Sequence, residues 1–415
     1  MKIKEFLEIN PSPSCPIQGR HIIEYIDTSS VIEGRLYDVQ QLVKTFPSRA
    51  QREIRTQDIL ISSVRPNLKH NYFVEENANG MIASSGFIHI RVKDSIKISP
   101  RFLYYYLTSP SQVNRYIKIA DSSQSAYPSF NKDIIEEIEF PNIDLPTQLR
   151  IAAILGSIDE KIELNRKKIT ELEALAKTIY DYWFVQFDFP DKNGKPYKSS
   201  GGKMVWNEQL KREIPEGWEV KKLSNYTVKI TKGTTPTSIG ASFSESGIRF
   251  IKVENIINGY LISTPETFIS HDIHMRMSRS SLEKNDLLIT IAGRLGDVAI
   301  VPEQILPANT NQAVGIIRFK HEFIKTVPYV HAYLSSKQMY SKIQNLNAQS
   351  IQKNLNLEIV GQIDVLFDSV VVNHFSTFME TIFEDIFYLQ EYNHKLISLR
   401  DTLLPLLMNG QVEVK

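Results

Sequence analysis

The stretch that decides the fold runs from Pro146 to Phe189 and reads PTQLRIAAILGSIDEKIELNRKKITELEALAKTIYDYWFVQFDF. From Ile151 onward, apolar or small residues recur at alternating steps of four and three, which is the spacing of a coiled-coil seam. The seam residues are Ile151, Leu155, Ile158, Ile162, Ile169, Leu172, Ala176, Ile179 and Trp183. The pattern predicts one long helix, on the order of 60 Å at a rise of 1.5 Å per residue. Such a helix requires a partner helix.

A second stretch, Val372 to Leu407, carries a similar seam with a local phase shift. Each stretch has one polar seam residue, Asn165 or Asn393, and a lone buried asparagine commonly fixes coiled-coil register. We therefore predict that the two helices pair antiparallel and that both asparagines set the register. Pro405 is expected to limit the last turn of the second helix. The alternative is that each helix packs only on its own domain, as amphipathic surface helices do.

Composition bounds the class of protein. With 415 residues and 42% hydrophobic content, the chain is long enough for two or three domains. The single cysteine, Cys15, excludes an internal disulfide and a cysteine-rich metal site, which fits a reducing cytoplasm. No apolar run reaches membrane-spanning length and the N-terminus lacks a signal peptide core, so we expect a cytoplasmic protein without a membrane partner. Lysine plus arginine (48) nearly equals aspartate plus glutamate (47), which argues neither for nor against nucleic-acid binding.

The sequence on both sides of the first long helix alternates short β-type runs with turn residues, and each region ends in a helical stretch. The two helical stretches, Pro100 to Ile119 and Thr326 to Leu346, are each expected to form one helix. This is an α+β pattern. The predicted organisation is a first domain (1–143), the first long helix (144–187), an exposed connector rich in Lys, Gly, Pro and Ser (188–206), a second domain (207–367) and a C-terminal helix (368–415).

The two halves repeat one plan. TQDILISSVRP aligns with KNDLLITIAGR and pairs Asp58 with Asp286, while FLYYYLTS aligns with YVHAYLSS. In the long helices ELNRKKI aligns with EYNHKLI, which pairs Asn165 with Asn393. Two copies of one domain, each followed by a long helix, predict a pseudo-two-fold molecule with two similar globular domains separated by an antiparallel coiled coil.

Three ordered segments resemble a known family. LPTQLRIAAILGSIDEKIELNRKKITELEALAKTIYDYWFVQFDFP is similar to the central conserved region of the specificity subunits of type I restriction–modification systems. GGKMVWNEQLKREIPEGWEVKKL resembles the start of their second target recognition domain, and LRDTLLPLLMNGQVEV resembles their C-terminal signature. The resemblance covers essentially the whole chain.

The resemblance implies a non-catalytic subunit that reads a bipartite, asymmetric sequence in double-stranded DNA. Each target recognition domain is then expected to bind one half-site, and the helices set the length of the unspecified spacer. The family's partners are two methyltransferase subunits, which modify adenine, and two restriction or translocase subunits. S-adenosylmethionine, ATP and Mg²⁺ are expected on those partners, and no cofactor on this chain.

Base reading requires side chains that match the groove pattern, such as Arg or Lys for guanine and Asn or Gln for adenine. The candidates in the first domain are Arg65, Asn67, Lys69, His70, Ser84 and Ser85. Those in the second domain are Lys232, Thr234, Thr235, Lys252, Asn255, Arg294, Asn309, Asn311 and Gln312. Each of these residues could instead be an ordinary turn residue, so the prediction concerns the group more than its members.

A second repeated polar segment precedes each long helix, with Gln124, Ser125, Tyr127 and Ser129 in the first copy and Gln349 and Ser350 in the second. A capping and packing role competes there with DNA contact. The run from Tyr104 to Tyr106 is expected to belong to a packed helix face, because nothing else indicates single-strand binding.

Enzyme signatures fail on inspection. AGRLGD lacks the third glycine of a dinucleotide-binding loop, and no P-loop GK[ST] motif is present. HDIHM places His271 and His274 three residues apart, and a solvated loop is expected there in preference to a metal site. Two alternatives remain open: a self-sufficient DNA methyltransferase or nuclease, which would turn over without a partner, and a coiled-coil assembly or inhibitor protein, which would never bind DNA selectively.

Overall fold

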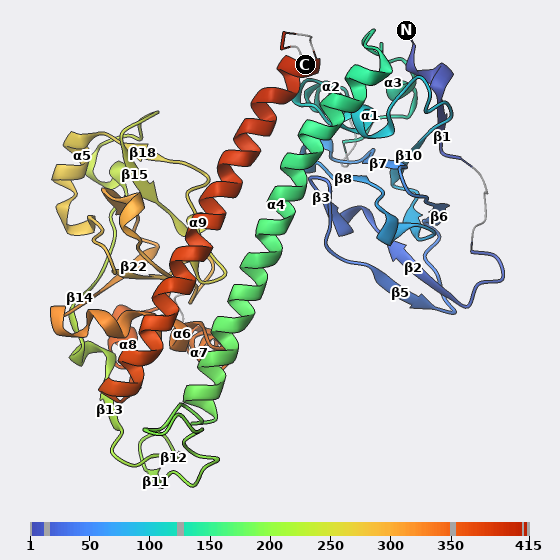
Figure 1. Cartoon of the computed structure of the whole chain (residues 1–415). Coiled ribbons are helices and arrows are strands. Elements are labelled where there is room, and N and C mark those ends of the chain that lie inside the picture. Colours follow the sequence, from blue (N-terminus) through green and yellow to red (C-terminus); the bar gives the residue numbers. More distant parts are fainter. Residues whose placement is uncertain (1, 12–16, 123–127, 349–353, 409–410, 413–415) are drawn as a thin grey trace. The chain divides into compact units, whose positions relative to one another are not determined.

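The computed structural model describes residues 2–11, 17–122, 128–348, 354–408 and 411–412. The chain forms two compact units, one made of Met1–Ile162 with Lys395–Lys415 and the other of Glu163–His394. Each unit contains one β-rich domain and its own sections of the two long helices, α4 and α9 (Figure 1).

The first domain is built on two four-stranded sheets, one antiparallel and one mixed. The antiparallel sheet has the order β1 (Leu7–Ile9), β10 (Phe87–Val92), β7 (Ile59–Ser62) and β8 (Asn71–Phe73). The mixed sheet has the order β5 (Gln40–Val43), β2 (Ile22–Ile26), β9 (Ile82–Ser84) and β6 (Ala50–Glu53). A short hairpin, β3 (Val31–Ile32) with β4 (Arg35–Leu36), lies between β2 and β5 in sequence. Strands β7, β8 and β9 are buried along their whole length, which explains their continuous apolar runs.

The second domain repeats the antiparallel sheet, the hairpin and part of the mixed sheet. Its antiparallel sheet has the order β14 (Thr227–Lys232), β22 (Val314–Phe319), β19 (Leu287–Thr290) and β20 (Val298–Ile300). Its mixed sheet has the order β18 (Phe268–Ile269), β15 (Ile248–Ile251) and β21 (Ala308–Thr310), and its hairpin is β16 (Ile256–Ile257) with β17 (Tyr260–Leu261). The register is also repeated, because Ile59 faces Ile90 as Leu287 faces Ile317. The α+β prediction with two similar domains is therefore confirmed.

The second unit has two additional two-stranded sheets, one between neighbouring strands and one between strands far apart in the sequence. They pair β11 (Met204–Asn207) with β12 (Arg212–Pro215) and β13 (Glu219–Lys222) with β23 (Asp364–Phe367). The segment before β11 is anchored as well as exposed: Asp188 is buried and accepts a hydrogen bond from Ser199 N at 2.7 Å.

Each helical stretch that the sequence predicts as one helix is two helices. The pairs are α1 (Pro100–Leu107) with α2 (Pro110–Asp121), and α6 (Val327–Ser335) with α7 (Lys337–Ala348). The first break falls at Ser109, which is extended because the ring of Pro110 disfavours a helical residue before it. The second falls at Ser336, whose hydroxyl accepts a bond from Met339 N at 3.3 Å and so caps the next helix. Short helices α3 (Asp133–Glu136), α5 (His271–Arg276) and α8 (Leu357–Gly361) complete the domains.

The long helices are α4 (Leu145–Tyr180) and α9 (Ser369–Met408), and they pair in both units, as the seam predicts. In the first unit Arg400 Nη1 contacts Asp159 Oδ1 at 2.9 Å, and in the second Asn165 Nδ2 donates to Asn393 Oδ1 at 2.8 Å. Within the second unit the rings of Tyr180 and Phe375 also pack, 6.2 Å apart, so the partner number falls as the α4 number rises and the pairing there is antiparallel. Both asparagines are buried.

The ends of both long helices differ from the prediction. Helix α4 passes into a π-helical turn, Asp181–Val185, and the chain then leaves the helix because Phe187 takes a left-handed φ of 65°. Pro405 lies inside the last turn of α9, which ends at Met408, one residue beyond the predicted Leu407. Leu404 and Leu407 lie in the same buried core as Leu155, and this packing outweighs the backbone hydrogen bond that proline cannot make.

Candidate nucleic-acid interface

One tight turn carries the exposed polar candidates of the first domain. Arg65 and Lys69 flank the 3₁₀ turn Pro66–Leu68, and both adopt left-handed backbone conformations, with φ of 48° and 50°. Arg65 N donates to Pro128 O at 2.8 Å, which fixes the start of the turn. The side chains of Arg65, Asn67 and Lys69 are exposed, and the Lys69 ammonium pairs with the Glu33 carboxylate at 2.9 Å. The turn therefore presents two cations and one amide to solvent.

The other three candidates of this domain lie deeper. His70 is half-buried, and burial lowers its pKa. Ser84 is fully buried at the end of β9, and its hydroxyl accepts a bond from Gly86 N at 3.2 Å. Ser85 is half-buried and donates its backbone N–H to Arg49 O at 2.7 Å. The hydrogen bonds of Ser84 and Ser85 hold the turn after β9, whereas Arg65, Asn67 and Lys69 are exposed to solvent.

Five candidates of the second domain come together between the end of β14 and the loop after β21. Thr234 N donates to Thr310 O at 2.9 Å, and the Thr235 hydroxyl donates to the side chain of Gln312. Gly233 permits this approach, because a Cβ there would lie 2.1 Å from Thr310 O. Lys232 and Gln312 are exposed, and Asn311 accepts a bond from Ala313 N at 3.1 Å.

The structure adds one residue to this group that the sequence did not single out. The exposed Arg279 donates from Nη2 to the Thr234 hydroxyl at 3.5 Å, and its own carbonyl accepts a bond from Lys229 Nζ at 3.1 Å. The basic run containing Arg276 and Arg279 was the available signal. We call Lys232, Thr234, Thr235, Arg279, Asn311 and Gln312 the Thr234 cluster.

The remaining candidates use their polar groups inside the second domain. Asn255 is 1% exposed, accepts a bond from Lys252 N at 3.0 Å and donates to Ile262 O at 3.2 Å. Asn309 is fully buried and donates to Met277 O at 3.1 Å. These amides spend their hydrogen-bonding capacity on backbone groups of the domain interior.

Arg294 and Lys252 are intermediate cases. The Arg294 guanidinium is half exposed, yet it donates to Val253 O at 3.1 Å and Ile256 O at 2.5 Å and so holds the turn that contains Asn255. The Lys252 ammonium lies 5.1 Å from the centroid of the Phe243 ring. Each of these two side chains therefore makes part of its contacts within the second domain.

The segment around His271 is a helix, so the expectation of a solvated loop is wrong. Ser270 caps α5 by accepting a bond from Ile273 N at 3.4 Å. A serine at this position is a helix start signal, which the sequence interpretation missed because it considered only the two histidines. His274 Nδ1 contacts Asn309 Oδ1 at 2.5 Å. Among the described residues, no group of three or more His, Cys, Asp or Glu side chains is arranged to hold a metal ion.

A buried carboxylate, Asp58 or Asp286, pairs with an arginine in each domain. Asp58 accepts bonds from Arg91 Nε at 2.8 Å and from His89 Nε2 at 2.7 Å. In the second domain Asp286 accepts from Arg318 Nε at 2.8 Å and Nη2 at 2.7 Å. Each carboxylate also caps the turn before its strand, through Arg55 N or Glu283 N at 2.8 Å. The pair fixes where β7 and β19 begin.

The pKa values of these two carboxyls shift in opposite directions. Burial disfavours the charged form of Asp58, but the hydrogen bonds from His89 and Arg91 outweigh it and hold its pKa below the ordinary value. Burial raises the pKa of Asp286, although Arg318 opposes this, and the repeat places Ile316 at the position of His89.

Some candidates lie outside the described residues: Cys15, Gln124, Ser125, Tyr127, Gln349 and Ser350. Ser129 is described and forms an isolated antiparallel bridge with Val64. Tyr104 and Tyr105 are buried in the core of the first domain, as expected. Within the described part of the chain, no helix has the length and apolarity needed to cross a membrane.

Comparisons with known proteins agree with this architecture. The family model of the type I restriction modification DNA specificity domain matches residues 1–174 and 215–366. The specificity subunit of the type I restriction enzyme HindI from Haemophilus influenzae is 23% identical over 441 residues, covering 94% of each chain. The MjaIX specificity subunit from Methanocaldococcus jannaschii is 24% identical over 348 residues, 81% of this chain and 74% of that one.

A solved structure shows the same fold. The crystal structure of a type I restriction–modification system S subunit from M. genitalium superposes with a TM-score of 0.59 at 16% identity, over 98% of this chain and 95% of that chain. The repeated domain, the paired helices and a family match over most of the sequence agree. The chain therefore belongs to the specificity subunits of type I restriction–modification systems.

Proposed function

We propose that this subunit reads a bipartite, asymmetric sequence in double-stranded DNA, with one half-site for each domain. The observation that carries the proposal is the repeat: the antiparallel sheets of both domains have the same strand order and register, and each domain presents exposed polar side chains at the loops after its buried strands. Two related domains with different loop residues are suited to reading two different short sequences.

The exposed groups are the ones proposed to touch DNA. In the first domain these are Arg65, Asn67 and Lys69. In the second they are Lys232, Arg279 and Gln312, together with the half-buried Thr234, Thr235 and Asn311 of the same cluster. Amide side chains such as Asn67 and Gln312 match the N6/N7 edge of adenine, while exposed cations suit phosphate or guanine. The buried Asn255 and Asn309 are proposed to support these loops and not to read bases.

The paired helices are proposed to set the spacer between half-sites and to hold the partners. Helix α4 has 36 residues and is about 54 Å long, and its hydrogen-bonded pairing with α9 makes it stiff. The proposed partners are two methyltransferase subunits and two restriction or translocase subunits. These would bring S-adenosylmethionine, ATP and Mg²⁺, so that this chain acts in the cytoplasm as a non-catalytic subunit.

Long-read methylation sequencing tests the proposal. DNA is compared from cells that express this chain with its cognate methyltransferase subunit and from cells that express either chain alone. We expect a split motif with modified adenines only when both chains are present. The same motif with the methyltransferase alone would place specificity elsewhere, and turnover by this chain alone would make it an enzyme.

A further inference from the structure

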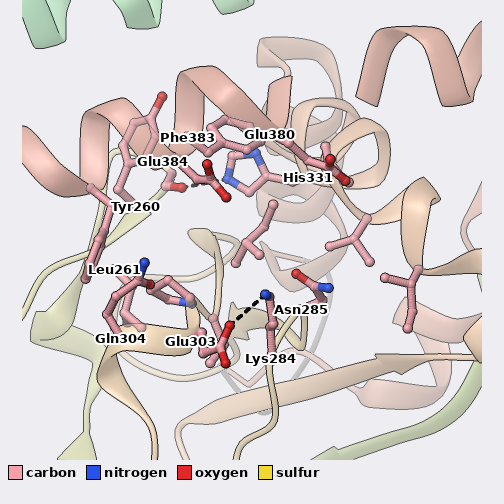
Figure 2. A pocket seen from close by; sticks show the side chains of 18 of the residues that line it. Tyr260, Leu261, Lys284, Asn285, Glu303, Gln304, His331, Glu380, Phe383 and Glu384 are labelled. Atoms are coloured by element: carbon pink, nitrogen blue, oxygen red, sulfur yellow. Dashed lines mark hydrogen bonds and ion pairs between the residues drawn. The ribbon is translucent and has the colours of Figure 1, made fainter. Parts of the chain in front are cut away.

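The second unit contains a cavity of about 190 Å³ between its β-rich domain and α9 (Figure 2). In that view one wall, from α6 and α9, carries His331, Glu380, Phe383 and Glu384. The facing wall carries Lys284 and Glu303, whose side chains pair at 2.8 Å. None of the residues proposed above to contact DNA lines this cavity.

Two buried hydrogen-bond acceptors in the wall lack donors. His331 is 4% exposed, and its Nε2 donates to Gly259 O at 2.6 Å, so Nδ1 carries a lone pair. Burial lowers the pKa of His331 to about 4, which keeps the ring neutral at physiological pH. Neither His331 Nδ1 nor Gln390 Oε1 has a partner among the described residues. An unmet buried acceptor costs free energy, so both atoms favour a ligand that donates N–H groups.

Charge and aromatic surface select the type of donor. The cavity is lined by three carboxylates, Glu303, Glu380 and Glu384, and by one ammonium, that of Lys284. The rings of Tyr260 and Phe383 stand 6.0 Å apart at 70° beside them. Excess negative charge next to aromatic faces attracts a cation that also has apolar surface.

The first domain fills the corresponding place with its own arginine. Arg101 pairs with Glu75 at 2.6 Å, and its guanidinium carbon lies 4.7 Å from the ring centroid of Phe73 and 5.8 Å from that of Tyr105. The guanidinium is thus held by a carboxylate and two aromatic rings at the base of α1. The cavity of the second domain is likewise lined by carboxylates and aromatic rings, but its lining residues include no arginine.

The repeat identifies what the second domain lacks. Strand β8 corresponds to β20 and α1 to α6, so that Arg101 corresponds to Pro328 and Glu75 to Pro302. Both prolines line the cavity. Replacing an ion pair by two short rings leaves space, and Glu380, Phe383 and Glu384 of α9 line that space.

We propose that this cavity binds a guanidinium group on an alkyl stem, with the guanidinium directed at Glu380, Glu384 and His331 Nδ1 and the stem against Phe383. The planar cation supplies several N–H donors, which satisfies the unpartnered acceptors. The site is separate from the recognition loops and does not depend on how DNA is read.

Calorimetric titration of the full-length chain tests the proposal with two probes of nearly equal shape, N-butylguanidinium and the neutral N-butylurea. We expect butylguanidinium to bind with a dissociation constant of about 1 mM or lower. Butylurea should bind at least about tenfold more weakly, because it lacks the charge. Equal affinity for both probes, or binding of neither, would overturn the proposal.

Substitutions then locate the site. Glu384→Gln combined with Glu380→Gln should weaken butylguanidinium binding about tenfold, whereas the matched control Asp385→Asn, an exposed carboxylate on α9 outside the cavity, should not. The double variant P302E/P328R recreates the arginine pair of the first domain and should abolish binding while circular dichroism shows a folded chain. The glutamine variants change only exposed side chains, so they decide the matter if the arginine variant does not fold.

Two sources could supply the guanidinium: a free alkylguanidine or an arginine side chain of a protein. Agmatine, which has a second positive charge, should bind more tightly than butylguanidinium if the source is free, because the rim holds three carboxylates. N-acetyl-arginine methylamide should bind more tightly than agmatine if the source is a protein. Failure of both to bind would contradict a guanidinium site.

Discussion

The two domains share strand order and register but stabilise the same buried carboxylate differently. Asp58 accepts hydrogen bonds from the side chains of Arg91 and His89, whereas the cationic partner of Asp286 is Arg318 and Ile316 occupies the position that corresponds to His89. The fold therefore preserves the ion pair and its cap, while the second domain has an apolar residue where His89 donates to Asp58. The carboxylate–arginine pair belongs to the common frame, and the histidine is specific to one domain.

The largest expected effect comes from removing each arginine in turn. Arg318→Ala leaves Asp286 buried without a cationic side chain and should destabilise the second domain by about 3–5 kcal/mol. Arg91→Ala should cost the first domain less, because His89 still donates to Asp58. Hydrogen exchange measured on peptides from β19 and β7 reports each domain separately. An equal or larger loss for Arg91→Ala would show that the histidine does not support the carboxylate.

Asn165 and Asn393 occupy equivalent positions in the two halves and bond to each other, so substituting them tests whether they act as a pair. Asn165→Leu leaves the Asn393 amide buried beside an apolar residue and should cost about 1–3 kcal/mol. The double variant N165L/N393L removes both polar groups and should recover most of the loss, as measured by urea unfolding. A double variant no more stable than the single one would mean that the amide pair does not act as a unit.

Matched loop substitutions compare the two domains in recognition. Asn67→Ala should relax one half-site and Gln312→Ala the other, each by about 1–3 kcal/mol of base discrimination. Methylation sequencing of each variant with its methyltransferase subunit reads both half-sites at once. The buried Asn309 is the contrasting case, because Asn309→Ala should lower domain stability before it alters a base preference.

The smallest expected effect is a difference in pH dependence. The pKa of Asp58 is lowered, so its stabilisation is present above the unfolded carboxyl value of about 3.9 and is lost as pH falls through the folded value. The pKa of Asp286 is raised, so the folded second domain takes up its proton first and gains relative stability as pH falls towards the unfolded value.

Acidification should therefore reduce hydrogen-exchange protection of β7 relative to β19. His89→Ile gives the first domain the residue found in the second and should abolish the difference. An unchanged difference in that variant would assign the pH dependence to other carboxyls.

Periodic features were predictable from the sequence, and polar side chains were not. The seam from Ile151 to Trp183 and the repeat depend on spacing, which burial enforces over many residues at once. An asparagine at a loop can read a base or satisfy the backbone, and Asn255 and Asn309 show that the same residue type does the second. Their burial depends on contacts with distant segments that no local pattern encodes.

The breaks in the helical stretches and the added site residue, Arg279, also depend on side-chain contacts that no local pattern encodes. Ser336 interrupts a helical pattern without a proline, because its side chain offers a cap that competes with helix continuation. Arg279 reaches Thr234 only because the chain folds back over 45 residues. The Lys232 and Gln312 regions lie together because Gly233 N donates to Val314 O and Thr234 N donates to Thr310 O, and these contacts were not encoded in any local pattern.

The central claim is that each domain reads one half-site independently, and domain exchange tests it most directly. Residues 1–143 are replaced by the first domain of another specificity subunit with a known target, and DNA from cells that also express the methyltransferase is sequenced for modified adenine. We predict that one half of the split motif changes to the donor's half-site while the other half and the spacer stay the same. A change in both halves, or in neither, would contradict the account.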